Sequence, residues 1–433
     1  MKITMIGTGY VGLVSGACFA EFGFTVTCVD KDQGKIDRLH QNVMPIYEPG
    51  LDDVVARNVA AGRLLFTTDI GPAVSNADAV FIAVGTPEGH DRRPNLSYAR
   101  AAAKEIAENL SGYTVIINKS TVPVGFGREV AEIIRATNPA ADFDVCSNPE
   151  FLREGSAIED FMRPDRVVVG AESDRAQEMM KGIYRPLYIN ETPILFTSLE
   201  TAELTKYASN AFLATKITFI NEIANLCEKV GADVQQVARG IGLDNRIGKK
   251  FLHAGAGYGG SCFPKDTNAL AELGKDRGAP QRIVETVIAA NDARKSEMAD
   301  RIIAALGGAV AGRKIGILGL TFKPNTDDMR DAVSLTVIPA LQAAGASIRA
   351  HDPAGMTEAS HMLKDVDFAT DAYDCARNAD ALVILTEWPE FRALDLARIK
   401  GLMEQPIFLD LRNVYQPQQV RDAGFLYYSI GRA

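Results

Sequence analysis

The chain has 433 residues, 47% of them hydrophobic and 23% charged, and its 46 basic and 55 acidic side chains leave a net charge of −9. This composition excludes a disordered or fibrous chain. The acidic balance argues against a nucleic-acid or membrane-surface binder, so an anionic ligand must meet a local group of cations. The length predicts roughly three domains of about 150 residues, or two large ones.

No stretch approaches the roughly 18 apolar residues of a membrane span. The N-terminal apolar run is interrupted at 7–10, so we do not expect a secretory signal. Strand-like runs rich in Val and Ile alternate with helical patterns such as 11–22 and 98–109. This alternation predicts a parallel sheet with helices on both faces. The strand-like runs lie at 2–7, 24–30, 79–84, 114–119, 143–147 and 166–170.

The pattern changes near Ser198, where a long helical stretch without Gly or Pro runs to about Gly231, and a second long helix is expected over 280–306. Further strand-like runs at 347–352, 380–387 and 407–411 predict another doubly wound unit. We therefore expect an α/β fold with two Rossmann-like domains, 1–197 and 309–433, joined by a central helical region, 198–308. Whether the long helices dimerise or only connect the domains stays open.

Gly7, Gly9 and Gly12 have the spacing of a dinucleotide-binding loop between a predicted strand and a predicted helix. The first glycine allows the tight turn, the second lets the backbone approach a pyrophosphate, and the third lets helix and strand pack closely. The phosphates bind at the helix N-terminus. Asp30 closes the next strand, and its carboxylate suits a ribose hydroxyl and repels a 2′-phosphate. This favours NAD over NADP, although nearby Lys35 weakens the preference.

Cys262 lies in the segment GAGYGGSCFPKD (255–266), in which four glycines let the backbone approach a ligand. Pro264 suits the first turn of a helix. A thiol beside a helix N-terminus and next to Lys265 has a lowered pKa, which activates it as a nucleophile. Asp266, four residues on, can lie on the same side of the helix.

The remaining cysteines lie in apolar patterns, and we expect them to be buried and inert. They are Cys18, Cys28, Cys146, Cys227 and Cys375. With no Cys-x-x-Cys pair, neither a metal site nor a dense disulfide framework is predicted, and a reducing cytoplasm fits best.

A nicotinamide cofactor and a nucleophilic cysteine together indicate oxidation of an alcohol through to an acid. Thiol addition to an aldehyde gives a thiohemiacetal, which loses hydride to form a thioester, and a carboxylate then activates water to release the acid.

Ordered motifs cover essentially the whole chain: GTGYVG (7–12), GTP (85–87), KSTVPVG (119–125), NPEFLREG (148–155), ELTKYASN (203–210), GGSCFPKD (259–266) and Phe322-Lys323 with Arg330. Together they resemble the nucleotide-sugar dehydrogenase family, and within it the UDP-glucose 6-dehydrogenases. The resemblance implies a homodimer that oxidises the C6 alcohol of UDP-glucose to UDP-glucuronate with two NAD+ and one water, as a supply for polysaccharide biosynthesis.

The resemblance also assigns roles to individual residues. Cys262 is the implied nucleophile, and Lys206 and Asn210 hold negative charge on the C6 oxygen. Asp266 handles protons with Lys206 through an ordered water. Glu150 is the implied base for thioester hydrolysis, and Thr121 helps to position the water.

The implied cofactor contacts are Gly7, Gly9, Tyr10, Val11, Gly12, Asp30, Lys35, Thr86, Thr121, Glu154, Lys265 and Arg330. The implied substrate contacts are Phe151, Leu152, Glu154, Lys206, Asn210, Arg246, Phe251, Tyr258, Gly259, Phe263, Phe322, Lys323 and Arg412. Of these, Arg246 resembles an arginine that reaches a neighbouring subunit's substrate. The lysines and arginines among these contacts supply the local positive charge that a pyrophosphate needs.

Other functions are compatible with parts of this pattern. GDP-mannose is an alternative substrate, while Ser261 before Cys262 differs from the His-Cys pattern usual for N-acetylhexosamine substrates. A two-electron 3-hydroxyacid dehydrogenase would need no cysteine nucleophile. A non-catalytic nucleotide sensor would need neither the thiol nor the carboxylates.

Overall fold

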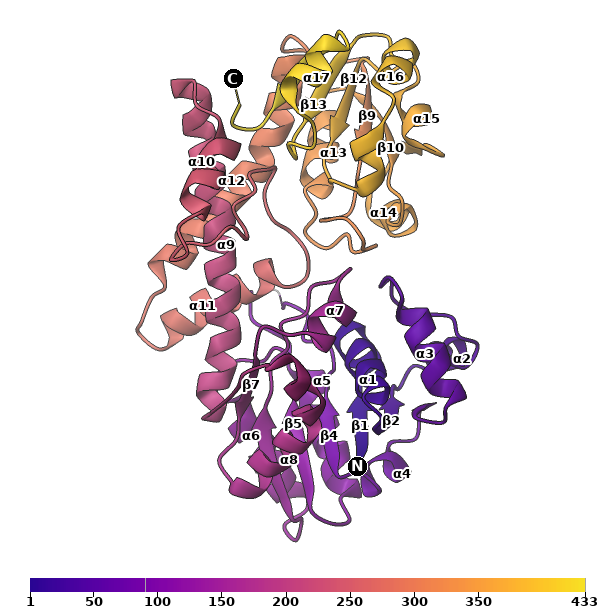
Figure 1. Ribbon diagram of the computed structural model, residues 1–433, viewed down its shortest axis with the longest axis vertical. Helices are drawn as coiled ribbons and strands as arrows, with labels where there is room; N and C mark the ends of the chain where they lie inside the picture. The colour runs from indigo at the N-terminus through magenta and orange to yellow at the C-terminus, as the bar shows by residue number, and fades with distance from the viewer. Residues whose placement is uncertain (90, 433) are drawn as a thin grey trace. The chain divides into compact units, whose positions relative to one another are not determined.

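The computed structural model describes residues 1–89 and 91–432. They form two compact units, one of residues 1–209 and one that begins at Asn210. Each unit contains one Rossmann-like sheet, and the long central helix α9 (Leu199–Val230) is continuous in Figure 1. The expected fold class is confirmed. The expected boundaries at 197 and 308 stay a prediction.

The first unit is built on an eight-stranded sheet. Its order is β3 (Leu64–Thr67), β2 (Thr25–Val29), β1 (Lys2–Ile6), β4 (Ala79–Ile82), β5 (Thr114–Asn118), β6 (Phe143–Ser147), β7 (Val167–Gly170) and β8 (Ile194–Thr197). The expectation of a parallel sheet needs one correction, because β7 pairs with β6 in the antiparallel direction. Runs of Val and Ile predict burial on both faces but do not encode strand direction.

Helices cover both faces of this sheet. Alternate side chains of each strand enter opposite cores, so that Met5 packs on one side and Ile6 on the other. One face is covered by α1 (Tyr10–Glu21), α2 (Gln33–His40), α3 (Leu51–Ala60), α7 (Ala157–Met162) and α8 (Asp174–Tyr184). The other is covered by α4 (Ile70–Ser75), α5 (Ser97–Asn109) and α6 (Phe126–Thr137).

The second unit has a six-stranded parallel sheet. Its order is β11 (Val366–Phe368), β10 (Ser347–His351), β9 (Lys314–Leu318), β12 (Ala381–Ile384), β13 (Ile407–Asp410) and β14 (Leu426–Ser429). Later residues of α9 pack on one face together with α10 (Val234–Gly242), α12 (Arg282–Ala305), α13 (Ser334–Ala343) and α14 (Met356–Met362). The other face is covered by α15 (Ala372–Ala376), α16 (Leu396–Leu402) and α17 (Pro417–Asp422).

Both predicted long helices are confirmed. No Gly or Pro interrupts α9 from Leu199 to Val230, and Gly231 follows it with a φ of 74°, a left-handed conformation typical of a residue that ends a helix. The second long helix, α12, covers the predicted range closely. In the part of the chain that the structure describes, no helix combines the length and the apolarity needed to cross a bilayer.

The loop between β1 and α1 requires glycine at two positions for steric reasons. Gly7 has a φ of 102°, which side-chain-bearing residues rarely adopt. A Cβ on Gly12 would lie 2.0 Å from the carbonyl oxygen of Gly7. At Gly9, by contrast, an added Cβ would meet nothing within 4 Å. The first and third glycines therefore shape the turn, and the second leaves space above it.

We expect Gly12→Ala to lower the free energy of unfolding by at least about 1–3 kcal/mol, because the new methyl group overpacks the junction of β1 and α1. Gly9→Ala is the matched control, and it should leave the midpoint of thermal unfolding near the wild-type value. Calorimetry of the two variants checks this. Equal stability of both would contradict the packing role of the third glycine.

Candidate active site

The dinucleotide loop lies at the carboxyl end of β1, the strand at which the chain order of the first sheet reverses. Ligands of doubly wound sheets bind at such switch points. α1 begins at Tyr10 with Gly9 as its N-cap, so its first N–H groups lie beside the open space at Gly9. These features fit a pyrophosphate.

Asp30 follows β2 and is held by the glycine loop. One of its carboxylate oxygens accepts hydrogen bonds from the Thr8 amide at 2.8 Å and the Thr8 hydroxyl at 2.7 Å, and Lys35 Nζ lies 3.8 Å away. Burial raises the pKa of Asp30, but the hydrogen bonds from Thr8 and Asp32 and the charge of Lys35 outweigh it, so the pKa lies below its usual value. An ionised Asp30 is suited to accept hydrogen bonds from ribose hydroxyls.

The Tyr10 hydroxyl joins the dinucleotide loop to the turn at the end of NPEFLREG. It donates to Glu48 and accepts from the Gly155 amide at 2.9 Å. The buried Glu48 carboxylate also accepts from the amides of Gly155 at 2.6 Å and Ala157 at 2.7 Å. Glu48 therefore fixes the turn that carries Glu154, a role that the sequence did not reveal.

The remaining predicted cofactor residues of the first unit lie around the same sheet edge. The Thr86 hydroxyl, in the loop after β4, donates to the backbone oxygen of Thr121 at 2.9 Å. Val11 lies in the first turn of α1 and packs against the core. The structure thus brings the predicted loops after β1, β2, β4 and β5 to one edge.

Lys206 and Glu150 form a buried ion pair. Lys206 Nζ lies 2.9 Å from Glu150 Oε1 and 2.7 Å from the Glu150 backbone oxygen, and both side chains are at most 6% exposed. Burial raises the pKa of Glu150. The charge and hydrogen bond of Lys206, the Leu152 amide and the charge of Lys119 outweigh this effect, so the pKa of Glu150 lies below its usual value. Glu150 is thus an ionised carboxylate.

Phe151 lies between two cations of the first unit. Its ring centroid is 5.4 Å from Lys206 Nζ and 3.6 Å from the guanidinium carbon of Arg166. Aromatic faces attract cations. The contact orients the NPEFLREG loop with respect to Lys206.

Glu203, in the same motif as Lys206, has a structural role. Its carboxylate accepts hydrogen bonds from the amides of Gly125 at 2.7 Å and Gly127 at 2.9 Å, and from the Ser147 hydroxyl at 2.8 Å. It satisfies N–H groups at the start of α6, where a negative charge is also favoured by the helix dipole.

Cys262 lies at the N-cap of α11 (Phe263–Asp276), with Pro264 in the first turn as predicted. It is half-buried, whereas the other five cysteines are buried, and all six are free. Burial raises the pKa of four of these thiols, Cys18, Cys28, Cys146 and Cys375, to about 12. Cys262 is therefore the cysteine with the environment of a nucleophile.

Asp266 connects α11 to α9 within the second unit. It is fully buried, one carboxylate oxygen accepts a 2.6 Å hydrogen bond from Asn210 Nδ2, and the other lies 2.5 Å from Lys265 Nζ. The backbone N–H of Asp266 donates to the Cys262 carbonyl at 2.9 Å. The structure thus brings Asp266 together with Asn210 and Lys265, and Lys265, which was predicted to lie beside the thiol, contacts this carboxylate.

The glycine loop before Cys262 packs tightly against the loop that follows β9. A Cβ on Gly259 would lie 2.3 Å from the Asp331 backbone oxygen, and one on Gly260 would lie 2.6 Å from the Phe322 ring. The Gly260 amide also donates to the Arg330 carbonyl at 2.8 Å. These contacts bring the predicted residues Gly259, Phe322 and Arg330 together.

Three predicted aromatic residues lie around the start of α11. Phe263 has its ring centroid 6.1 Å from that of Phe251 and 5.9 Å from that of Tyr258. The buried Tyr258 also receives a 3.1 Å hydrogen bond on its carbonyl from Asn291 Nδ2.

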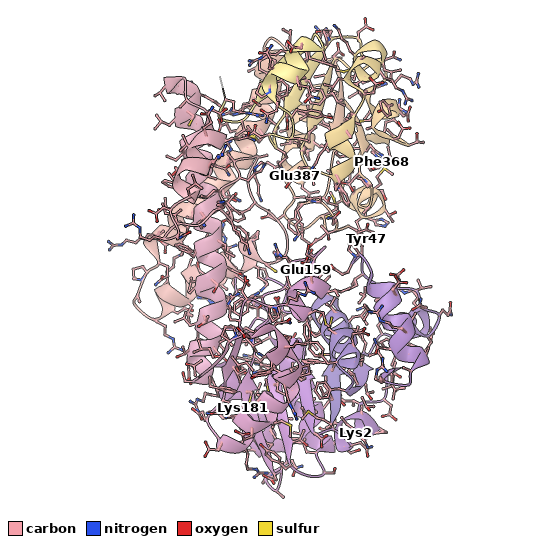
Figure 2. The ribbon with its side chains drawn as sticks, viewed as in Figure 1. Lys2, Tyr47, Glu159, Lys181, Phe368 and Glu387 are labelled. Atoms are coloured by element: carbon pink, nitrogen blue, oxygen red, sulfur yellow. The ribbon has the colours of Figure 1, made fainter. Side chains whose placement is uncertain are left out.

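The predicted cations of the second unit follow its strands. Lys323 lies two residues after Thr321, and its Nζ is 5.3 Å from the Phe322 ring. Arg412 follows β13 and lies 3.3 Å from the carboxylate of Glu387, which is labelled in Figure 2. The Arg330 guanidinium is held by Asp328 at 2.7 Å. The loops after β9 and β13 therefore supply cations at the carboxyl end of this sheet, and the loop after β12 supplies the carboxylate that pairs with Arg412.

Arg246 differs from these cations. Its side chain is 89% exposed and pairs with Asp244, two residues earlier. Its predicted contact with a neighbouring subunit's substrate stays a prediction.

Comparison with known proteins finds relatives of a single family along the whole chain. Models of the UDP-glucose/GDP-mannose dehydrogenase family match its NAD-binding domain at 1–188, its central domain at 200–293 and its UDP-binding domain at 316–417. A UDP-glucose 6-dehydrogenase of Rhizobium meliloti is 62% identical over all of both chains, and one of Bacillus subtilis is 51% identical over all of this chain and 93% of the other. A UDP-glucose dehydrogenase structure from Pyrobaculum islandicum has a TM-score of 0.92 at 37% identity, covering 100% of this chain and 98% of that one.

The burial of the cysteines predicts a single reactive thiol in the folded protein. An aromatic disulfide reagent should label one sulfur per chain rapidly at pH 8, since the buried thiols react only after unfolding. Cys262→Ala should abolish the rapid phase, whereas Cys227→Ala should retain it. Rapid labelling that survives in Cys262→Ala would show that another sulfur is accessible.

Proposed function

The chain belongs to the UDP-glucose/GDP-mannose dehydrogenase family, and we propose that it oxidises C6 of UDP-glucose twice to give UDP-glucuronate, using two NAD+ and one water. It is an NAD-dependent oxidoreductase with a UDP-sugar substrate. The observation that carries the four-electron reaction is the half-buried Cys262 at the N-terminus of α11, while the other cysteines are sealed.

In this proposal the first unit binds the cofactor. Gly7, Gly9 and Gly12 and the N-terminus of α1 receive the pyrophosphate, and Asp30 binds a ribose hydroxyl. The other proposed contacts of the cofactor in this unit are Tyr10, Val11, Lys35, Thr86 and Thr121. Bound NAD+ supplies a hydride acceptor for each oxidation.

The first oxidation needs a group that takes up the C6 hydroxyl proton and stabilises the developing negative charge. We assign the stabilisation of the charge to Lys206 and Asn210, which lie one helical turn apart on α9. Asp266 receives the hydroxyl proton through a water. The Cys262 thiol then adds to the aldehyde: a C–S bond forms and the thiol proton passes to the former carbonyl oxygen. Loss of hydride and of that proton leaves a thioester.

Hydrolysis of the thioester requires a carboxylate that is ionised at neutral pH. Glu150 has this property because Lys206 and the Leu152 amide stabilise its charge. We assign Glu150 as the base that removes a proton from water, with Thr121 positioning the water and Asp266 assisting. The C–S bond breaks, the sulfur of Cys262 regains a proton, and the acid leaves.

The uridine diphosphate is assigned mainly to the second unit. Lys323, Arg412 and the loop at Tyr258 and Gly259 provide charge and hydrogen-bond donors for a diphosphate. Phe251, Phe263 and Phe322 supply apolar surface. Phe151, Leu152 and Glu154 of the first unit are assigned to the sugar, and Lys265 and Arg330 to the cofactor.

We also propose a homodimer formed through α9. Phe212, Phe219 and Leu226 recur every seven residues on this helix and are 65%, 49% and 56% exposed. A heptad of exposed apolar side chains on an uninterrupted helix is typical of a packing interface. A second copy of this chain is the proposed occupant, and it would place the exposed Arg246 near a partner.

Six free cysteines support a reducing cytoplasm as the location.

The reaction is tested by counting products. With UDP-glucose, the purified protein should form two NADH per UDP-glucuronate, and Cys262→Ala should bind NAD+ but form no UDP-glucuronate. One NADH per product would contradict the thioester route. Turnover of GDP-mannose at a higher rate than UDP-glucose would assign the chain to the other substrate of its family.

The interface is tested by sedimentation. Phe219→Glu should shift the protein from dimer to monomer at micromolar concentration, because a charge at the centre of the stripe cannot be buried without a partner. Tyr98→Glu, at an aromatic position on α5 that is 59% exposed, is the control and should stay dimeric. A wild-type monomer, or a dimeric Phe219→Glu, would rule this interface out.

A further inference from the structure

Lys119 is a buried lysine to which the proposed reaction gives no role. It follows β5 directly, belongs to the KSTVPVG motif and is 5% exposed. Its Nζ donates to Asn148 Oδ1 and to the Tyr184 hydroxyl, each at 3.1 Å. Among residues 1–89 and 91–432 it forms no ion pair with a carboxylate. Burying a charge without such a partner costs stability, so the position needs an explanation.

The surroundings of Lys119 hold an ammonium in place. Its Nζ lies 5.8 Å from the ring centroids of both Phe161 and Tyr184, which attract the cation through their π faces. Burial lowers the pKa of Lys119 to about 8, with Glu150 opposing that change and Lys206 adding to it. The side chain is therefore mostly charged at neutral pH. Burial raises the pKa of Tyr184, which stays a neutral hydroxyl.

Asn148 connects this ammonium to Glu150. It lies two residues before Glu150, its Nδ2 donates to the Val168 carbonyl of β7 at 2.8 Å, and its backbone N–H donates to the Asn118 carbonyl at 2.8 Å. These bonds and the one from Lys119 fix the start of the NPEFLREG loop between β5 and β7. Glu150 is thus held by Lys206 in direct contact and by Lys119 through the loop.

We propose that Lys119 is a positioning residue whose buried ammonium, anchored by Asn148 and Tyr184, keeps Glu150 ionised and its loop in place for thioester hydrolysis. The inference rests on the proposed role of Glu150 as the base. The charges of two ammonium groups, Lys206 in contact and Lys119 beyond Asn148, act on one carboxylate and leave this part of the site with a surplus of positive charge. Such a surplus keeps the carboxylate deprotonated even where water is excluded.

Lys119→Met tests the charge, because methionine has a similar length and no ammonium, and Lys119→Gln is a second variant that retains polar contacts. The pKa of Glu150 is measured by 13C NMR with glutamate labelled at the side-chain carboxyl, and the signal is assigned by its loss in Glu150→Gln. Both Lys119 variants should raise the pKa of Glu150 by about one unit, since a nearby opposite charge lowers a carboxyl pKa by about 1–3 units. Tyr184→Phe keeps the ammonium and should leave the pKa of Glu150 unchanged.

The activity profile separates this inference from the proposed function. In Lys119→Met the acidic limb of the pH profile of kcat should move to higher pH, together with the pKa of Glu150. An unchanged pKa of Glu150 in both variants would overturn the role of Lys119. A shifted pKa with an unmoved limb would uphold the electrostatic role and overturn the assignment of Glu150 as the base.

Thermal unfolding gives a readout that a merely structural lysine would not produce. The folded protein holds the Lys119 proton less tightly than the unfolded chain, so the charge lowers stability at pH 7, and this penalty declines as pH rises through about 8. Lys119→Met should therefore melt higher than wild type at pH 7, by a margin that narrows at pH 9. A variant that melts lower at both pH values would show that the ammonium serves the fold.

Discussion

The ion pair between Lys206 and Glu150 is the interaction on which the proposed chemistry of the first unit depends. Both groups are almost fully buried, so neither can exchange its partner for water without a large loss of free energy. The pair fixes the NPEFLREG loop against the first turns of α9. One turn earlier, Glu203 holds the start of α6 in the same way. The helix is thus attached to the sheet by charges as well as by apolar packing.

The two sheets carry different side chains at the same edge, which suits them to different kinds of ligand. In the first, a glycine turn leaves backbone N–H groups free beside an acidic residue, an arrangement suited to a dinucleotide. In the second, the acid at the end of β10, Asp352, accepts hydrogen bonds from the Leu320 and Thr321 amides and is fully buried. The carboxylate of Asp352 therefore holds the loop after β9 inside the fold, and we propose that Lys323 and Arg412 bind the diphosphate there.

Most central strands and both long helices could be predicted from the sequence, while the sheet edges could not. Of the strands missing from the prediction, β9 is central, and β3, β8, β11 and β14 are the outermost strands of their sheets. Edge strands are half exposed, so Val366–Phe368, which has Asp367 at its centre, lacks the apolar run that marks a strand covered on both faces. The antiparallel direction of β7 also cannot be predicted from its amino-acid composition.

A similar limit applies to the site. Glu150, Lys206, Asn210, Cys262 and Asp266 were predicted because they lie in motifs. The residues that hold such groups in place are fixed by contacts between distant segments, such as Glu48 with Gly155 and Lys119 with Tyr184. Neither contact follows from local spacing.

The distribution of the thiols has a consequence for oxidative damage. Peroxide attacks thiolates that solvent can reach, so oxidation to sulfenic acid should concentrate on the one half-buried sulfur. The sealed sulfurs offer no resolving partner that could trap it as an internal disulfide without unfolding. Recovery would then depend on an external small thiol, and prolonged exposure would carry Cys262 to an irreversible sulfinic acid.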